Sequence, residues 1–292
     1  MSGQLRALKN RIRSVESTQK ITKAMEMVAT AKLKRYQTWM HQAAPYVASL
    51  EGVLTRLLRT GVPPTHPLLE TREEKEAALV LITSDTGLCG SFNNELIETA
   101  KRFLKGMAKT PLLIGMGKNG INGLSRAGYA WHAAFKDTKT SQLESVFTEI
   151  SLMAGTLFCE KKVDAVYVIH SHFVSKGISR ATTDKLLPFA LSPAGASEKE
   201  PAADGTDYIM EPDPAALFAR LIPLVFESKM RMCFLESLVA EQTARMNAMH
   251  QATENASELI DSLVLLRNKV RQAAITKELI EIVSGSQALK TG

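Results

Sequence analysis

The C-terminal third of the chain carries the most restrictive pattern in the sequence, a repeat whose steps alternate strictly between three and four residues. The stretch from Thr206 to Ser284 contains no glycine. A 3-4 alternation of this length is typical of a coiled-coil seam rather than of a helix lying on a globular core. Thirteen of the seventeen positions are apolar: Phe218, Leu221, Val225, Met232, Leu235, Val239, Met246, Met249, Ala256, Ile260, Leu263, Val270 and Ala274. The other four are Ser228, Gln242, Thr253 and Arg267.

The start of this helix is marked by Asp213 and Pro214, which suit the N-cap and the first helical position. Pro223 falls inside the first turns and is expected to kink them. A rise of 1.5 Å per residue makes about 70 helical residues a rod of roughly 100 Å.

A second glycine-free stretch, from Gln4 to Glu51, predicts a long N-terminal helix. Both helices join the same middle region, so we expect them to return alongside each other as an antiparallel pair. The N-terminal helix is the shorter, so the C-terminal one should protrude beyond it. The side chains expected to face the partner helix are Leu5, Leu8, Ile12, Val15, Ile21, Met25, Val28, Tyr36, Val47, Leu50, Leu54 and Leu57.

The middle of the chain alternates short apolar runs with helical patterns, which predicts a mainly parallel sheet covered on both faces. Strands are expected at 77–82, 111–114 and 163–173, an edge strand at 179–187, and helices at 94–106 and 141–161. The fold prediction is an α/β protein in which a long antiparallel two-helix coiled coil carries an inserted Rossmann-like domain. The predicted segments are 1–60 (N-terminal helix), 75–190 (α/β domain), 191–211 (linker and foot) and 212–290 (C-terminal helix).

The charge of the chain is concentrated in its first helix. The whole sequence has a net charge of +6, whereas residues 1–40 hold nine basic and two acidic side chains, a net +7. Such a helix favours an acidic partner: nucleic acid, lipid headgroups or an acidic protein surface. Residues 18–35 in particular are basic, yet their large apolar side chains form no clean stripe.

Composition excludes several classes of protein. No apolar run approaches the ~20 residues of a membrane span. The first residues lack the apolar core of a signal peptide, so a cytosolic location is expected, with a mature mitochondrial form as the alternative. Cys89, Cys159 and Cys233 are far apart with no CxxC, which argues against a disulfide framework and a thiolate zinc site.

Motifs for catalysis or cofactors are weak or missing. Gly115-Met-Gly117-Lys-Asn-Gly120 matches the dinucleotide fingerprint, but it follows the second strand of the unit, so a glycine-rich turn is the better interpretation. No P-loop motif occurs. His170 and His172 share a strand face, but no third ligand is evident. We therefore predict no catalytic residue, no cofactor, no metal and no small-molecule substrate.

Three functions remain open on the residues alone. The chain could be a mechanical shaft in a larger assembly, a nucleic-acid-binding coiled coil, or an α/β enzyme with helical extensions. The second lacks base-reading positions and would show steep salt dependence. The third lacks a catalytic set and would turn over a nicotinamide cofactor.

Five stretches resemble the gamma subunit of F-type ATP synthases, in the family's order from about residue 4 to the C-terminus. They are RIRSVESTQKITKAMEMVATAKL (11–33), GLCGSFN (87–93), YIMEPDP (208–214), EQTARMNAMHQATENA (241–256) and NKVRQAAITKELIEIVSG (268–285). The chain departs from the family pattern at Thr86, where Arg is common, and at Leu266-Arg267, where a Tyr is usual. The paired-cysteine insertion of chloroplast members is absent.

The resemblance implies a non-catalytic rotor shaft inside a collar of three alpha and three beta subunits, which couples proton or sodium flow to ATP chemistry on the beta subunits. Its foot would touch the epsilon subunit and the membrane c-ring, as a peripheral component on the cytoplasmic face of a bacterial inner membrane, with no nucleic acid bound. By resemblance, the beta-subunit contacts are Lys20, Lys23, Met25, Arg245, Arg271, Gln272, Thr276 and Glu278. The implied c-ring and epsilon contacts are Tyr208, Met210 and Glu211.

Overall fold

The computed structural model describes residues 2–59, 66–175, 178–189, 211 and 213–290. The chain divides into two compact units, one made of residues 1–30 with 245–292 and the other of residues 31–244. Each unit therefore takes part of both terminal helices, α1 (Ser2–Arg59) and α5 (Pro214–Lys290). The predicted segments follow the chain instead, and their boundaries stay a prediction.

The larger unit is built on a five-stranded sheet in the order β3-β2-β1-β4-β5. Neighbouring strands among β1 to β4 pair in parallel, and β5 closes one edge antiparallel to β4. All six side chains of β1 are buried, as expected for a central strand covered on both faces. This confirms the predicted parallel sheet with an edge strand at 179–187. The strands are β1 (Ala77–Ile82), β2 (Leu112–Met116), β3 (Ala133–Phe135), β4 (Ala165–Ser175) and β5 (Ile178–Leu187).

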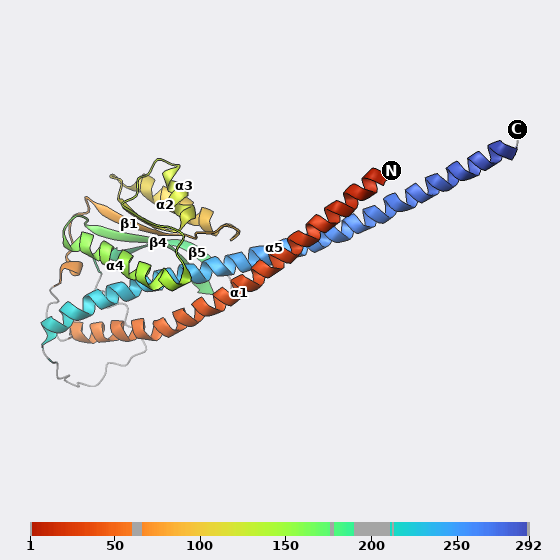
Figure 1. The fold of residues 1–292 in the computed structure, drawn as a ribbon. Helices are drawn as coiled ribbons and strands as arrows, with labels where there is room; N and C mark the ends of the chain where they lie inside the picture. Colours follow the sequence, from red (N-terminus) through yellow and green to blue (C-terminus); the bar gives the residue numbers. More distant parts are fainter. Residues whose placement is uncertain (1, 60–65, 176–177, 190–210, 212, 291–292) are drawn as a thin grey trace. The chain divides into compact units, whose positions relative to one another are not determined.

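Helices cover both faces of this sheet (Figure 1). On one face lie α2 (Phe92–Gly106) and α3 (Lys118–Ser125), and on the other lie α4 (Leu143–Cys159) and the first part of α5. The rings of Phe147 and Phe234 stack 4.4 Å apart and join α4 to α5. The Ser171 N–H donates to the Ser237 hydroxyl at 3.0 Å, which ties α5 to β4. Two short 3-10 turns, Pro67–Leu69 and Thr140–Gln142, complete the described elements.

The start of α5 follows its predicted signals. The Asp213 carboxylate accepts the Ala216 N–H at 2.8 Å, so it caps the helix as its position before Pro214 predicts. The helix continues through Pro223 to Lys290. Among the described residues, no helix combines the length and the apolar character needed to cross a bilayer.

The glycine fingerprint forms a tight turn between β2 and α3. Gly117 has φ +95°, and a Cβ atom there would lie 2.1 Å from the Thr83 carbonyl oxygen, so only glycine fits. The Asp85 carboxylate accepts the backbone N–H of Lys118 at 2.9 Å, at the N-terminus of α3 where a phosphate would bind in a nucleotide site. Close packing therefore accounts for these glycines, and the chain's own carboxylate takes the anion position.

Candidate interaction surface

The smaller unit is an antiparallel pair of helices whose register is set by polar contacts. The Thr253 hydroxyl donates to the Thr22 hydroxyl at 2.8 Å. One turn along, the Glu26 carboxylate lies 3.2 Å from His250 Nδ1 and 3.1 Å from Lys23 Nζ. Residue numbers rise along α5 as they fall along α1, which confirms the predicted antiparallel pairing. Polar residues at seam positions specify a single register because sliding would leave them unpaired.

The inward face of α1 differs from the predicted one between residues 19 and 29. Ile21 and Val28 were expected to face α5, but they are 58% and 56% exposed, while Thr22 and Ala29 are buried. The reason is register: the strict 3-4 alternation that starts at Leu5 reaches Gln19, Thr22, Glu26 and Ala29. The larger apolar side chains are consequently displaced to the outer face.

The predicted seam of α5 is confirmed between Met246 and Ala274, where every buried residue is a seam position; from Cys233 to Thr243 nearly all side chains are buried, so burial does not distinguish the seam there. None of its seventeen positions is exposed. The Thr22–Thr253 pairing places the start of α1 close to Ala274, which is the last buried residue among the described side chains of α5. Every described side chain from Ile275 to Ser284 is exposed. As predicted, α5 extends beyond α1, and Figure 1 shows its end running past the N-terminus.

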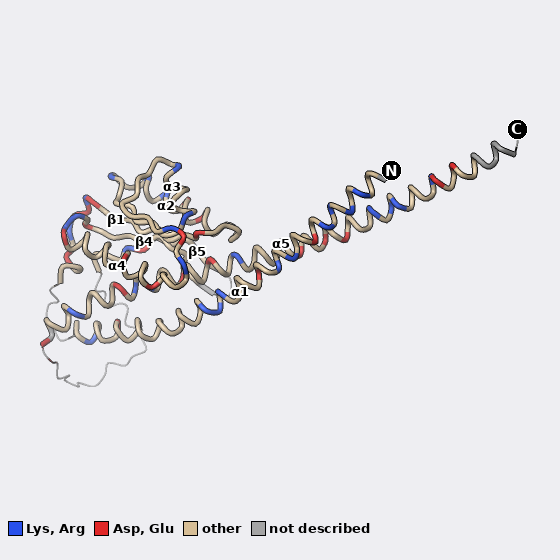
Figure 2. Tube along the Cα trace, in the orientation of Figure 1, with Lys and Arg blue, Asp and Glu red and all other residues tan. Residues whose placement is uncertain are grey.

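The predicted contact residues on α1 lie on or beside its outer face. Lys20 and Lys23 are exposed, and at 100° per residue they share that face with Ile21, Met27 and Val28. Met25 is half-buried at the edge of the seam. Figure 2 shows Lys and Arg repeating along the N-terminal part of α1. The outer face thus alternates cations with apolar side chains.

Lys23 already has a partner on its own helix. Its ammonium hydrogen bonds to Glu26, and this bond, with a smaller contribution from His250, lowers the pKa of the Glu26 carboxyl. The Lys23 side chain is nevertheless about half exposed, which leaves donors free to face a second carboxylate.

The predicted contact residues near the end of α5 gather on one side of the helix. Arg271, Gln272, Thr276 and Glu278 are all exposed. Their helical angles fall within an arc of roughly 160°. The same arc holds four apolar side chains that are each about half exposed or more: Ile275, Leu279, Ile282 and Val283. This group of eight residues is called the tip face below. Thr253 pairs with Thr22, which lies between Lys20 and Lys23 in the sequence; the outer face of α1 that carries these lysines is called the basic face below. From Thr253 to Arg271 helix α5 rises roughly 27 Å, so the tip face and the basic face are separate surfaces.

The remaining predicted contact residues are placed differently. Arg245 is 7% exposed, and so little accessible surface does not suit a contact with another chain; we leave it out of the proposed surface. Glu211 is exposed just before α5. Tyr208 and Met210, like the rest of the predicted linker and foot up to residue 210, lie outside the described residues.

One cluster escaped the sequence reasoning. His170, for which no further ligand was evident, lies beside Asp184 and Cys233, which come from β5 and α5. The only sequence signal was the pair of histidines at alternate positions of a strand.

Comparisons with known proteins give consistent matches over nearly the whole chain. A family model described as ATP synthase matches residues 4–289. The ATP synthase gamma chain of Moorella thermoacetica is 40% identical over 286 residues, covering 98% of this chain and 99% of its own length. That of Chlorobaculum tepidum is 39% identical over 296 residues with the same coverage of both chains.

Solved structures match in fold. A chain of the Euglena gracilis mitochondrial ATP synthase (OSCP/F1/c-ring) has a TM-score of 0.66 at 16% identity, covering 100% of this chain and 96% of that one. A chain of the Tetrahymena thermophila mitochondrial ATP synthase central stalk/c-ring has a TM-score of 0.56 at 23% identity, covering 80% and 99%.

Proposed function

The chain belongs to the ATP synthase gamma-chain family, and we propose that it is the rotating shaft that couples ion flow through the membrane sector to ATP chemistry on the surrounding beta subunits. The observation that carries this proposal is the tip face of α5, whose apolar side chains are not covered by any helix in the part of the chain that the structure describes. A shaft enclosed by a collar of alpha and beta subunits would bury this face.

The tip face also carries groups suited to a contact that must form and break. A planar guanidinium such as that of Arg271 can hold a carboxylate through two parallel hydrogen bonds. Gln272 and Thr276 can add neutral hydrogen bonds beside it. We call this reversible contact of Arg271 and Gln272 with a beta subunit the catch. Because these side chains stay partly solvated, its net free energy is modest, about 1–3 kcal/mol. We infer that it engages one beta subunit at a time and releases as the shaft turns.

The basic face of α1 suits a surface that moves past it. Deeply interlocking side chains would lock a rotor in one position, since packed interiors do not deform continuously. Lys20 and Lys23 on one side of this face offer charge, and Met25 at its other edge offers a flexible thioether rather than a rigid knob. We propose that this face meets acidic segments of the beta subunits.

The chain itself is proposed to be non-catalytic. It has no P-loop motif, and the glycine turn at 115–120 is filled by contacts with Thr83 and Asp85. The isolated chain should therefore hydrolyse no ATP and bind no NAD(H). Calorimetry that finds a stoichiometric nucleotide site of micromolar affinity would contradict this.

The residues just before α5 are proposed to meet the membrane sector. Glu211 with Tyr208 and Met210 would contact the epsilon subunit and the polar loops of the c-ring, on the cytoplasmic face of a bacterial inner membrane. The chain would then be a peripheral component, held by its partners.

The catch is tested by the double variant Arg271→Ala, Gln272→Ala in the assembled complex. We expect steady-state ATP hydrolysis per complex to fall severalfold while assembly persists, because the apolar part of the tip face is unchanged. The matched control is Lys277→Ala. Lys277 lies in the same segment of α5 but outside the arc of the tip face, and its Nζ atom is 3.8 Å from Glu281 Oε1 of the same helix. Native gels verify subunit stoichiometry. Undiminished activity in fully assembled double variant would refute the catch, and an equal loss in the control would make it non-specific.

A further inference from the structure

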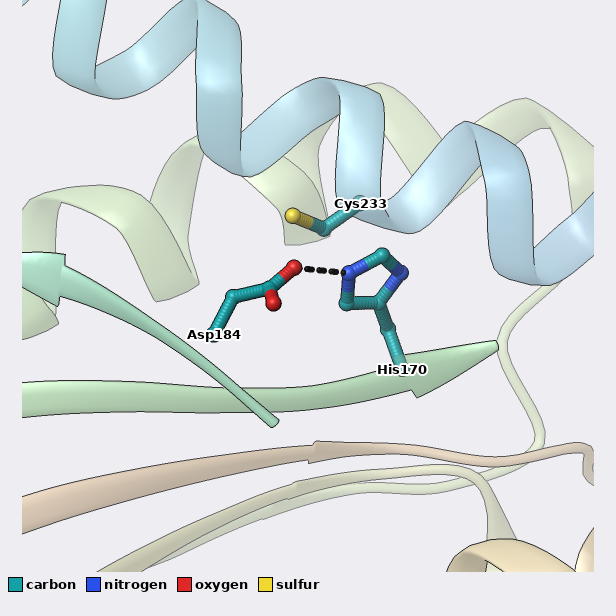
Figure 3. Close-up of side chains that lie close together, drawn as sticks. All are labelled: His170, Asp184 and Cys233. Atoms are coloured by element: carbon teal, nitrogen blue, oxygen red, sulfur yellow. Dashed lines mark hydrogen bonds and ion pairs between the residues drawn. The ribbon is translucent and has the colours of Figure 1, made fainter. Parts of the chain in front are cut away.

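Three potential metal ligands from three different elements meet on one face of the sheet. They are His170 of β4, Asp184 of β5 and Cys233 of α5 (Figure 3). One ligand atom of each lies within 4.8 Å of the other two. His170 and Cys233 are 1% and 8% exposed, whereas the Asp184 side chain is about half exposed. The group is thus buried from two sides and reachable by water from the third.

The strand register and the position of α5 bring these three side chains together. Antiparallel pairing sets His170 opposite Thr182 and Val168 opposite Asp184, so the side chains of His170 and Asp184 project to the same face of neighbouring strands. On the helix side, the Ser171–Ser237 hydrogen bond holds α5 against β4 one turn beyond Cys233. All three ligands are carried by regular elements, which gives a more defined geometry than loops would.

We propose that His170, Asp184 and Cys233 bind a zinc ion that clamps α5 to the β4–β5 edge of the sheet. An imidazole, a carboxylate and a thiolate are the three ligand types that zinc accepts, with bonds of about 2.0–2.3 Å. Tetrahedral coordination at those lengths requires ligand atoms roughly 3.3–3.8 Å apart. Small side-chain movements reach this from the present spacing, and a water or the second Asp184 oxygen completes the shell.

The surroundings of His170 provide a second, independent argument. Its buried Nδ1 has no hydrogen-bond partner, and the Glu236 Oε2 atom lies 3.7 Å away. A zinc-bound histidine ordinarily donates its other N–H to a carboxylate, which fixes the tautomer that leaves Nε2 free to bind the metal. Glu236 is held in place by His172 Nδ1 at 2.7 Å. A slight movement of Glu236 would complete this arrangement.

Zinc binding at this site would release one proton, that of the Cys233 thiol. Burial, followed by the nearby Glu236 and Asp184 carboxylates, raises the pKa of the Cys233 thiol, so the metal-free chain carries S–H. Zinc takes the place of that proton, which leaves to solvent. A metal bound at Nε2 would leave the neutral His170 ring with its proton on Nδ1. No oxidant or reductant is needed.

A purely structural interpretation competes with this proposal. His170 Nε2 lies 2.8 Å from Asp184 Oδ2, a good hydrogen bond that would by itself explain why the two residues meet. It does not involve Cys233 and leaves Nδ1 unpartnered. The two interpretations differ in whether the Cys233 sulfur binds the metal, so the experiment measures metal binding by this sulfur.

The first measurement uses the full chain, freed of metal with a chelator and titrated with Zn²⁺ in competition with a chromophoric chelator. We expect one ion per chain. Titration with Co²⁺ should then give a thiolate-to-metal absorption band. Cys233→Ser should remove this band and weaken zinc binding at least tenfold, while the control Cys159→Ser, which changes an exposed cysteine elsewhere, should leave both unchanged. Circular dichroism verifies that each variant is folded.

Two further variants keep the test decisive if Cys233→Ser does not fold. Asp184→Asn changes a half-exposed ligand, and Glu236→Gln removes only the outer carboxylate, for which a 10- to 100-fold loss of affinity is expected. In the wild type, zinc should also protect Cys233 from alkylation. The proposal is overturned if the wild type binds zinc no more tightly than Asp184→Asn, or if Cys233 is alkylated equally fast with and without zinc.

Discussion

Two leucines in one stretch of α5 allow a sharp test of the helix pairing in the smaller unit. Leu263 is 6% exposed at a seam position, and Leu265, two residues later, is 71% exposed. Leu263→Ala and Leu265→Ala make the same chemical change with the same loss of helix-forming side chain. Any difference between the variants must therefore come from the contact with α1.

The expected magnitude follows from burial. Replacing a buried leucine by alanine costs 2–5 kcal/mol in protein cores. The low end of that range applies here, about 2–3 kcal/mol, because a seam between only two helices can partly close and is near water on both sides. Leu265→Ala should stay within about 0.5 kcal/mol of wild type. Each 1.4 kcal/mol corresponds to a factor of ten, so the difference is a factor of roughly 30–150 in the opening equilibrium.

Native-state hydrogen exchange measures this opening locally, which suits a chain with two compact units. We expect amides of α1 and α5 around Ile12 and Ala256 to exchange roughly 30- to 150-fold faster in Leu263→Ala and to be unchanged in Leu265→Ala. Amides of β1, in the other unit, serve as the internal reference. Equal acceleration in both variants, or none in either, would refute the seam as the source of stability.

Three further predictions test other parts of the chain. Met25→Lys adds a cation beside the basic face, and a new ion pair worth about 1–3 kcal/mol in one rotary position should slow ATP-driven pumping; unchanged pumping over a range of temperature would mean that the residue faces no acidic surface. Glu211→Lys should weaken coupling in membranes without affecting ATPase activity of the detached sector; loss of that activity instead would assign Glu211 to folding or to the collar. Backbone N–H groups of Glu76 and Lys75 lower the pKa of Asp164, so its stabilisation is present above pH 4 and is lost as the pH falls through its folded-state value. Asp164→Asn should therefore reduce the free energy of unfolding, measured by urea denaturation at pH 7, by about 1–2 kcal/mol. The difference should shrink as the pH falls through the folded-state pKa of Asp164, and a pH-independent difference would contradict the linkage.

The sheet and the seam of α5 could be predicted because their signals are local. Strand β1 is a run of apolar residues bounded at both ends, and the structure begins and ends it at the predicted residues, 77–82. In α5 the repeat is carried by large apolar side chains, so its period can be counted. Short β3, by contrast, has three residues and only partly buried or exposed side chains, and no pattern in the sequence predicts it.

The inward face of α1 was predicted wrongly because the size of the apolar side chains and the 3-4 alternation of the seam point to different residues. Ile21 and Val28 are the more hydrophobic residues, but Thr22 and Ala29 continue the 3-4 alternation. Extending the alternation from Leu5 without regard to side-chain size would have given the correct face. A seam of this length fixes register collectively, and a few small or polar positions cost less than a shift of the whole helix.

The zinc ligands could not be predicted because their proximity is a property of the fold alone. His170 and Asp184 lie close together through the register of the β4–β5 pair, which the positions of the two residues in the sequence do not reveal. Cys233 joins them only because α5 crosses that edge of the sheet. Neither sequence spacing nor residue type contains this information, and a bound ion would add a constraint that the apolar core does not supply.

The two exposed surfaces of the smaller unit differ in a way that matches the two contacts proposed for them. On the basic face of α1, the small Ala24 lies between Ile21 and Met27, and Lys20 and Lys23 lie on the Met27 side, so the apolar surface is low and any contact stays shallow. On the tip face of α5, Ile275, Leu279 and Ile282 follow one another along a single side with polar groups at its margins. Each of these has about half or more of its surface still to bury, which corresponds to about 1–2 kcal/mol per side chain on enclosure. The basic face of α1 therefore suits a partner surface that slides past it, and the tip face of α5 suits a collar of subunits that encloses it.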